Sequence, residues 1–342
     1  MLLYVVKRLA WAVLMVGIVS LITFVIFLGV PDTINSRQGL VTPNLQAQWH
    51  LDGHSFPSKY VLFLKHVFLH GDFGRSMRQP ISVRELITTA LPVTASLVIG
   101  GTLMFLLLSF PIGLLSALRP RSLLDKGLMV LLLVGISAHP VFLGLLLSYF
   151  LGFQWHLFPI AGYCNLRYHA NDICGGPRYW AYHMILPWIT FAFLFAALYA
   201  RMIRANVLEQ LGEDYVRTAR AKGAGSWRIL RRHVARNALL PVVSMLGMDV
   251  GLAFGGAIFI ETVFDLPGVG QALYRALGSA DEPVILGVAI LVSLAVVIMN
   301  LAADLLYCIV DPRIGLRTRQ RESVPAVRRR RAATREVTEP VT

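Results

Sequence analysis

The chain has 342 residues, of which 56% are hydrophobic and 15% are charged. This composition excludes an ordinary soluble domain and leaves room for about six membrane spans with their connecting loops. The formal net charge of +13 raises the question of nucleic-acid binding. The chain shows neither an aromatic-interleaved basic sheet nor zinc-knuckle spacing, so no nucleic-acid partner is expected.

Six apolar runs are long enough to cross a bilayer, which takes roughly 20 residues. None of them shows the alternation over about ten residues that is typical of membrane strands. We therefore predict an all-α integral membrane protein with six transmembrane helices. The runs are Leu9–Val30, Leu91–Leu118, Gly127–Leu151, Tyr179–Ala200, Asn237–Ile260 and Pro283–Val310.

The runs divide the chain into a first span with its N-terminus (1–30), an external loop (31–90), a five-span core (91–312) and a tail (313–342). The first run exceeds the usual apolar core of a signal peptide and lacks a good cleavage site, so we expect an uncleaved span. In the external loop, the apolar stretch Tyr60–Leu69 is too short to span and is predicted to be an interfacial helix. The Arg-rich tail is predicted to be disordered and to touch anionic lipid.

The distribution of Lys and Arg predicts the orientation. If the N-terminus lies inside, 23 of the 32 basic residues fall on inside segments and 9 fall on outside loops. The positive-inside rule then places both termini in the cytoplasm. The net charge therefore reflects topology and contact with anionic lipid.

Two cysteines, Cys164 and Cys174, lie ten positions apart in the outside loop between the third and fourth predicted spans. Two thiols in one loop on an oxidising side suggest a disulfide, which would clip this short length of chain. Two unpaired thiols are the alternative.

Two histidine pairs, His50 with His54 and His66 with His70, have the i, i+4 spacing of a helical metal site. No third ligand at a sensible spacing accompanies either pair, so we expect structural or solvated histidines and no metal. His139, beside Pro140 in the third run, is expected to be a hydrogen-bond donor at a kink.

The fifth run carries Gly247, Gly251 and Gly255 at i, i+4, i+8, a spacing that lets another helix approach closely. At about 100° per residue, Asp249 lies on nearly the opposite face. A carboxylate within a span is a candidate for a watery transport pathway. A buried Asp that is hydrogen-bonded to a neighbouring helix is the alternative.

A polar segment, 207–236, separates the fourth and fifth runs. Glu213 and Asp214 favour a helix start after Gly212, since acidic side chains suit the positive end of a helix. Gly223 is a good C-terminal cap. One face of the predicted helix carries Tyr215, Thr218, Ala219 and Lys222.

A second short helix is predicted after it, capped by Ser226. Its apolar stripe consists of Trp227, Leu230 and Val234, and its basic residues away from that stripe are Arg228, Arg232 and Arg236. Two such helices suit insertion into a groove on a partner protein. A basic loop resting on lipid headgroups is the alternative.

The segment 213–223, Glu-Asp-Tyr-Val-Arg-Thr-Ala-Arg-Ala-Lys-Gly, resembles the cytoplasmic coupling loop, or EAA loop, of ABC importer permeases. It is most similar to the version found in the dipeptide/oligopeptide/nickel branch. Further motifs resemble the same branch in order along nearly the whole chain. They include Gly71-Asp72-Phe73-Gly74-Arg75-Ser76, Pro92-Val93-Thr94, Glu261-Thr262-Val263-Phe264 and Leu266-Pro267-Gly268-Val269-Gly270.

The resemblance implies an import permease with the ABC type I importer fold, located in a bacterial inner membrane. Its implied partners are a second homologous permease, two cytoplasmic ABC ATPase subunits or domains that bind ATP and Mg, and an external substrate-binding protein. The residues implied to couple to the ATPase are Asp214, Tyr215, Arg217, Thr218, Ala219, Arg220, Ala221, Lys222 and Gly223.

The chain itself is expected to hold no cofactor and to have no catalytic residues. It lacks the Gly-x-x-x-x-Gly-Lys-[Ser/Thr] phosphate loop and any hydrolytic constellation. Peptides are the implied cargo, while nickel chelates, haem and glutathione-like solutes remain open. An ion-coupled secondary transporter that depends on Asp249 and a membrane-embedded scaffold or receptor subunit are the alternatives from other classes.

Overall fold

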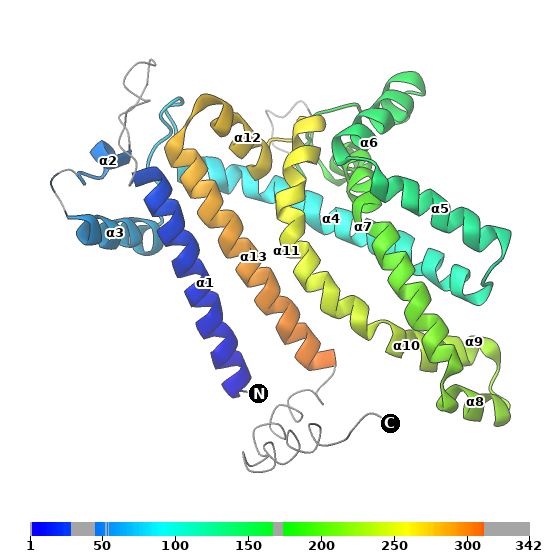
Figure 1. The fold of residues 1–342 in the computed structure, drawn as a ribbon. Coiled ribbons are helices and arrows are strands. Elements are labelled where there is room, and N and C mark those ends of the chain that lie inside the picture. The colour runs from blue at the N-terminus through cyan, green and yellow to red at the C-terminus, as the bar shows by residue number, and fades with distance from the viewer. Residues whose placement is uncertain (1, 29–44, 52, 54, 167–173, 311–342) are drawn as a thin grey trace, which may run out of the picture.

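The computed structural model describes residues 2–28, 45–51, 53, 55–166 and 174–310 (Figure 1). Every named element within these ranges is a helix or a helical turn. The predicted disordered tail and His54 lie outside the described residues.

Four helices are long and apolar enough to cross a membrane: α1 (Leu2–Leu28), α4 (Val83–Leu118), α7 (Pro177–Gly212) and α13 (Glu282–Val310). Two bent helix pairs bring the number of spans to six if each pair counts as one. The shorter elements are α2 (Leu45–Gln48), α3 (Phe56–Leu64), η2 (Lys65–Leu69), α5 (Leu123–Ser137), α6 (Pro140–Leu147), η3 (Ser148–Gln154), α8 (Asp214–Ala221), α9 (Ser226–Ile229), η4 (Leu230–Val234), α10 (Ala235–Ala238), α11 (Leu240–Val263) and α12 (Val269–Ser279).

The third predicted span breaks between α5 and α6, whose axes, continued through η3, meet at 106°. Pro140 starts α6, where its missing N–H costs nothing. His139 is the N-cap, and its Nδ1 accepts a hydrogen bond from the Val141 N–H at 3.3 Å. His139 therefore lies at a kink as predicted, and its Nδ1 supplies the acceptor that the N–H groups at a helix start need. Donation from its other ring nitrogen stays a prediction.

The fifth predicted span, α11, bends by 61° between Pro241–Gly247 and Gly251–Val263. A Cβ at Gly251 would lie 3.3 Å from Val296 Cγ1, so α13 approaches closely there. Nothing lies within 4 Å of a Cβ at Gly255. The close approach predicted for these small residues is therefore observed at Gly251, and a helix packed at Gly255 stays a prediction.

The core of the molecule is the contact between α4 and α7. A Cβ at Gly101 would lie 2.4 Å from the Phe191 ring, and one at Gly113 would lie 2.6 Å from the Ala200 carbonyl oxygen. Only glycine permits helices to approach this closely. Buried side chains on the two helices include Leu97, Phe105, Leu186, Phe191, Tyr199 and Ile203.

The external loop contains the helix predicted at Tyr60–Leu69, formed by α3 and the π-helical turn η2. It packs beside α1 and the start of α13 (Figure 1). Phe63 is fully buried in a cluster with Phe24, Leu286 and Ile290. The helix is confirmed, and its position at a membrane interface stays a prediction.

Candidate functional site

The predicted coupling helix is α8, which follows α7 directly (Figure 1). α7 ends at Gly212, and the next residue, Glu213, has extended backbone angles (φ −70°, ψ 149°) and is the N-cap of α8. Gly223 has φ +78°, the left-handed conformation that favours glycine after a helix end. The predicted start, acidic first turn and terminating glycine are confirmed.

One face of α8 holds it to the rest of the molecule. Val216 is fully buried. The Tyr215 hydroxyl donates to Gln210 Oε1 at 2.6 Å and accepts from Asn237 Nδ2 at 3.3 Å. Because Gln210 belongs to α7 and Asn237 to α10, α8 is bound to the helices on both sides of the segment.

The other face of α8 is basic and open. Its exposed residues include Arg217 and Arg220, and the C-cap Lys222 after the helix is also exposed. Arg217 forms only a surface contact with Asp214, at 3.4 Å between Nη1 and Oδ1, and such pairs contribute little to stability. A hollow of about 390 Å³ separates α8 from α9, lined by Tyr215, Thr218, Ala219, Lys222, Gly223, Ala224 and Arg228. All nine predicted coupling residues lie on this single short element or its cap.

The second helix differs from the prediction in two respects. Gly225, rather than Ser226, occupies the N-cap. Ile229, Leu230 and Val234 form the buried face, whereas the Trp227 side chain is 69% exposed. The π-helical turn η4 pairs residues five apart, so Val234 aligns with Ile229 instead of Trp227. Arg228, Arg231 and Arg232 surround Trp227 on the exposed side.

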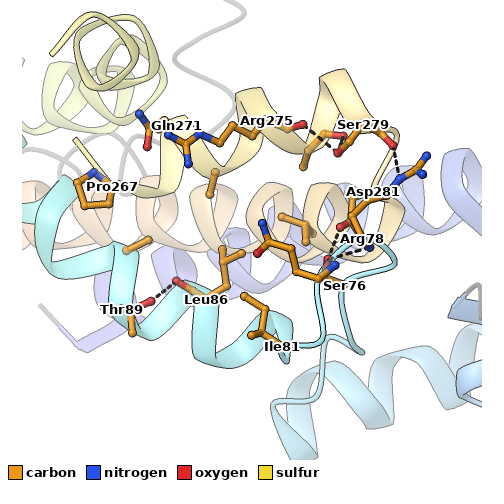
Figure 2. Close-up of a pocket in the computed structure, with 16 residues that line it drawn as sticks. Ser76, Arg78, Ile81, Leu86, Thr89, Pro267, Gln271, Arg275, Ser279 and Asp281 are labelled. Carbon is orange, nitrogen blue, oxygen red and sulfur yellow. Dashed lines mark hydrogen bonds between the residues drawn. The ribbon is translucent and has the colours of Figure 1, made fainter. Parts of the chain in front are cut away.

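At the opposite end of the molecule, a cavity of about 250 Å³ lies between α4, α12 and the loop at residues 76–81 (Figure 2). Ser76 Oγ donates to Asp281 Oδ2, and the Met77 N–H donates to Asp281 Oδ1 at 3.0 Å. Arg78 Nε donates to the Ser279 carbonyl oxygen at 2.9 Å, as Figure 2 shows. The motif at residues 71–76 thus joins the external loop to the turn between α12 and α13.

A second buried carboxylate, Glu261, organises the same end. It accepts a hydrogen bond from Thr94 Oγ1 at 2.6 Å and another from the Gln271 N–H at 2.9 Å. Thr94 Oγ1 in turn accepts from the Val269 N–H at 2.8 Å. A Cβ at Gly268 would lie 2.3 Å from the Glu261 carboxyl carbon, so glycine is needed there. Residues of the motifs at 92–94 and 266–270 therefore pack around the carboxylate of Glu261, which belongs to the motif at 261–264. These contacts fix the start of α12.

The roles of Glu261 and Asp281 were missed by sequence reasoning. A role for Glu261 could have been predicted, because an acidic side chain at the end of an apolar run needs a hydrogen-bond or ionic partner. The partners could not be named, since Thr94 lies 167 residues from Glu261 and Ser76 lies 205 from Asp281.

Asp249 lies in the bend of α11, and its Oδ2 accepts a hydrogen bond from the Tyr199 hydroxyl at 2.7 Å. This contact to α7 agrees with the alternative of an Asp that is hydrogen-bonded to a neighbouring helix. Elsewhere, Cys164 and Cys174 form a disulfide with a Cα–Cα distance of 5.3 Å. The Cys164 sulfur lies 3.4 Å from His183 Nδ1 on α7.

His66 and His70, which form one of the two histidine pairs, each make other contacts. His66 stacks on the Trp49 ring with a centroid distance of 5.0 Å, and its Nδ1 lies 3.7 Å from Asp72 Oδ2. His70 Nδ1 contacts the Lys65 carbonyl oxygen at 3.1 Å. Within the described part of the chain, no three His, Cys, Asp or Glu side chains gather in a way that could hold a metal ion.

Comparisons with known proteins agree with this geometry. Residues 109–316 match the family described as "Binding-protein-dependent transport system inner membrane component". The oligopeptide transport system permease protein AppB of Bacillus subtilis (strain 168) is 38% identical over 259 residues, which cover 75% of this chain and 80% of AppB. The probable D,D-dipeptide transport system permease protein DdpB of Escherichia coli (strain K12) is 35% identical over 327 residues, which cover 89% of this chain and 94% of DdpB.

A solved structure shows the same fold. The inward-facing MetNI methionine ABC transporter contains a chain with a TM-score of 0.53 and 17% identity, covering 66% of this chain and 97% of that chain. The fold is that of an ABC type I importer permease. The chain therefore belongs to the family of binding-protein-dependent transport system inner membrane components.

Proposed function

We propose that this permease is one of two membrane subunits of an ATP-driven importer for di- and oligopeptides. The observation that carries the proposal is α8, a basic helix that is anchored by Val216 and Tyr215 and exposes Arg217, Arg220 and Lys222. A helix fixed on one face and open on the other suits a groove on a partner protein. The relatives named for oligopeptide and D,D-dipeptide transport support peptides as the cargo.

The proposal assigns the energy source to partner subunits. Two cytoplasmic ABC ATPases bind ATP and Mg and hold α8 of this chain and the corresponding helix of a second, homologous permease. An external binding protein delivers the peptide. The bias of Lys and Arg supports an orientation with α8 and both termini in the cytoplasm, and this places the α12 end outside.

Other cargoes and classes find less support. The alternative cargoes are nickel chelates, haem and glutathione-like solutes, but the relatives reported above are named for oligopeptide and D,D-dipeptide transport. A secondary transporter would need Asp249 free to titrate or to bind an ion. Its hydrogen bond from Tyr199 gives it a structural partner instead.

The test is a charge reversal on the open face of α8. Arg217→Glu with Arg220→Glu changes the charge without touching Val216 or Tyr215, so the permease should insert normally. We expect the ATPase subunits to co-purify about tenfold less with this variant, because like charges across an interface repel and weaken association. ATP-dependent peptide uptake into proteoliposomes should fall in parallel.

Arg84→Glu with Arg178→Glu is the matched control. It makes the same charge change at exposed positions near the N-termini of α4 and α7, away from α8, and should leave ATPase co-purification unchanged. Unchanged co-purification and uptake in the α8 variant would refute the coupling role. Uptake that is driven by a proton gradient without ATP would refute the importer class.

A further inference from the structure

Near the α8 end of the molecule, the carboxylate of Asp125 in the first turn of α5 accepts hydrogen bonds from three residues. Arg204 on α7 donates to it through two nitrogens, Nε to Oδ1 at 3.0 Å and Nη2 to Oδ2 at 2.9 Å. The Arg121 N–H donates to Oδ2 at 2.9 Å, and Ser116 Oγ donates to Oδ1. Only 4% of Asp125 is exposed. A paired guanidinium and carboxylate of this geometry fix orientation as well as distance.

These donors come from three different elements. Ser116 lies in the last turns of α4, Arg121 lies in the turn between α4 and α5, and Arg204 lies on α7. Close beside them, Gly113 of α4 packs against Ala200 and Ile203 of α7. Asp125 therefore joins α5 to a pair of helices that already form one tightly packed unit.

Beyond its first turn, few of the described side chains of α5 are buried within this chain. Among its described side chains only Asp125 and Gly135 are buried, and Gly135 meets the ring of Phe193. Leu123, Leu131 and Val134 are 88%, 56% and 63% exposed. The pair of Asp125 and Arg204 therefore fixes the first turn of α5, in addition to the contacts that α5 makes with α7 along its length.

We call the pair of Asp125 and Arg204 the clamp. Its Arg204 lies on α7, the continuous helix that ends directly before α8. Arg204 precedes Gly212, the last residue of α7, by about 12 Å along the helix axis. α8 follows after a single non-helical residue, Glu213. A displacement of α8 is therefore delivered to Arg204 without passing through a loop.

We propose that Asp125 and Arg204 are positioning residues that transmit the movement of α8 to α5. The proposal rests on the proposed coupling of α8 to an ATPase and adds the route by which that movement continues. Movement of α7 pulls the first turn of α5 through the guanidinium and carboxylate. Because α5 and α6 are separate helices that meet at 106°, α5 can swing about Ala138 and His139 while α6 stays packed against α7 and α11.

The functional test removes the pair without leaving a buried charge. Asp125→Asn with Arg204→Met keeps the volumes and neutralises both partners, which is far milder than stranding one ion. In the assembled transporter in proteoliposomes, we expect ATP hydrolysis to continue and the peptide transported per ATP to fall about tenfold, a typical size for coupling between sites. Arg204→Lys, which keeps the charge but not the two parallel bonds, should give an intermediate ratio.

A distance measurement separates transmission from a merely structural role. Spin labels at Leu131→Cys on α5 and Leu145→Cys on α6 occupy side chains that are 56% and 55% exposed, with Cys308→Ser removing the remaining thiol. With the clamp intact, ATP should change the α5–α6 distance distribution. In the double variant the distribution should no longer respond to ATP, although ATP is still hydrolysed.

Two outcomes would overturn the proposal. One is an unchanged ratio of peptide to ATP in the assembled double variant, and the other is a label distance that responds to ATP equally with and without the clamp. Failure of the proposed function looks different, because the unmodified transporter would then show no ATP-dependent peptide uptake. A double variant that does not assemble would be replaced by Arg204→Lys, for which the same ratio and the same distance decide.

Discussion

The α12 end of this molecule and the open face of α8 place their polar groups in opposite ways. At the α12 end, Glu261 and Asp281 are buried and accept hydrogen bonds from hydroxyl and backbone N–H groups. At the α8 end, the charges of Arg217 and Arg220 are exposed on a short helix. Buried carboxylates that need several fixed donors hold their surroundings in one arrangement. Exposed charges on a helix leave an association surface.

These two regions should therefore differ in how they respond to substitution. The α12 end joins segments that lie far apart in the sequence, and its stability should depend on single atoms of the buried carboxylates. The open face of α8 should tolerate substitution with little loss of stability, while its substitutions change association with a partner. The predictions below test this division.

The largest loss of stability should follow Glu261→Ala. The Gln271 N–H and the Thr94 hydroxyl would lose their acceptor, and hydrogen bonds to a buried charge are worth about 1.5–3 kcal/mol each. We expect a drop of at least about 3 kcal/mol in the free energy of unfolding, measured by denaturant titration of the purified protein in detergent. Glu85→Ala, at an exposed position of α4, is the control and should cost less than about 1 kcal/mol.

A smaller loss should follow Gly268→Ala. Its new methyl group would meet the Glu261 carboxyl group at 2.3 Å, and overpacking of this kind costs about 1–3 kcal/mol. Gly278→Ala, in the same part of the chain but with nothing within 4 Å, should be neutral or stabilising, because alanine favours a helix. Equal thermal stability of the two variants would contradict the close approach between Gly268 and Glu261.

The smallest loss of stability should follow Gly223→Ala at the end of α8. Its φ of +78° strains any residue with a Cβ by about 1–2 kcal/mol, but the site is open. Gly225→Ala, where φ is −65°, is the control. We expect both variants to remain folded by size-exclusion chromatography and only Gly223→Ala to lose ATPase co-purification. A loss of ATPase co-purification in both variants would contradict the role of the left-handed conformation of Gly223 in coupling.

The sequence predicted the α8 end better than the α12 end, and the reason is physical. The bounds of α8 depend on local signals, namely the acidic residues at its start and a glycine after its end. The partners of Glu261 and Asp281 depend on how distant helices pack, which one sequence does not show. The sequence motifs include Ser76, Thr94 and Glu261, but they do not indicate which of these side chains form hydrogen bonds with distant residues.

The misplacement of Trp227 has a different cause, which is that the helix after Ser226 was assumed to be regular. Regular periodicity placed Trp227 with the buried residues, but the π-helical turn η4 exposes it. Periodicity fails wherever the backbone departs from 3.6 residues per turn.

The central claim is that the ATPase binds the open face of α8. The most direct measurement is photo-cross-linking from p-benzoylphenylalanine placed at Ala221, an exposed residue of α8, in membranes that hold the assembled transporter. The claim predicts a covalent adduct with the ATPase subunit from Ala221 and none from the same label at Arg84 near the N-terminus of α4. No adduct from Ala221, or equal adducts from both positions, would contradict it.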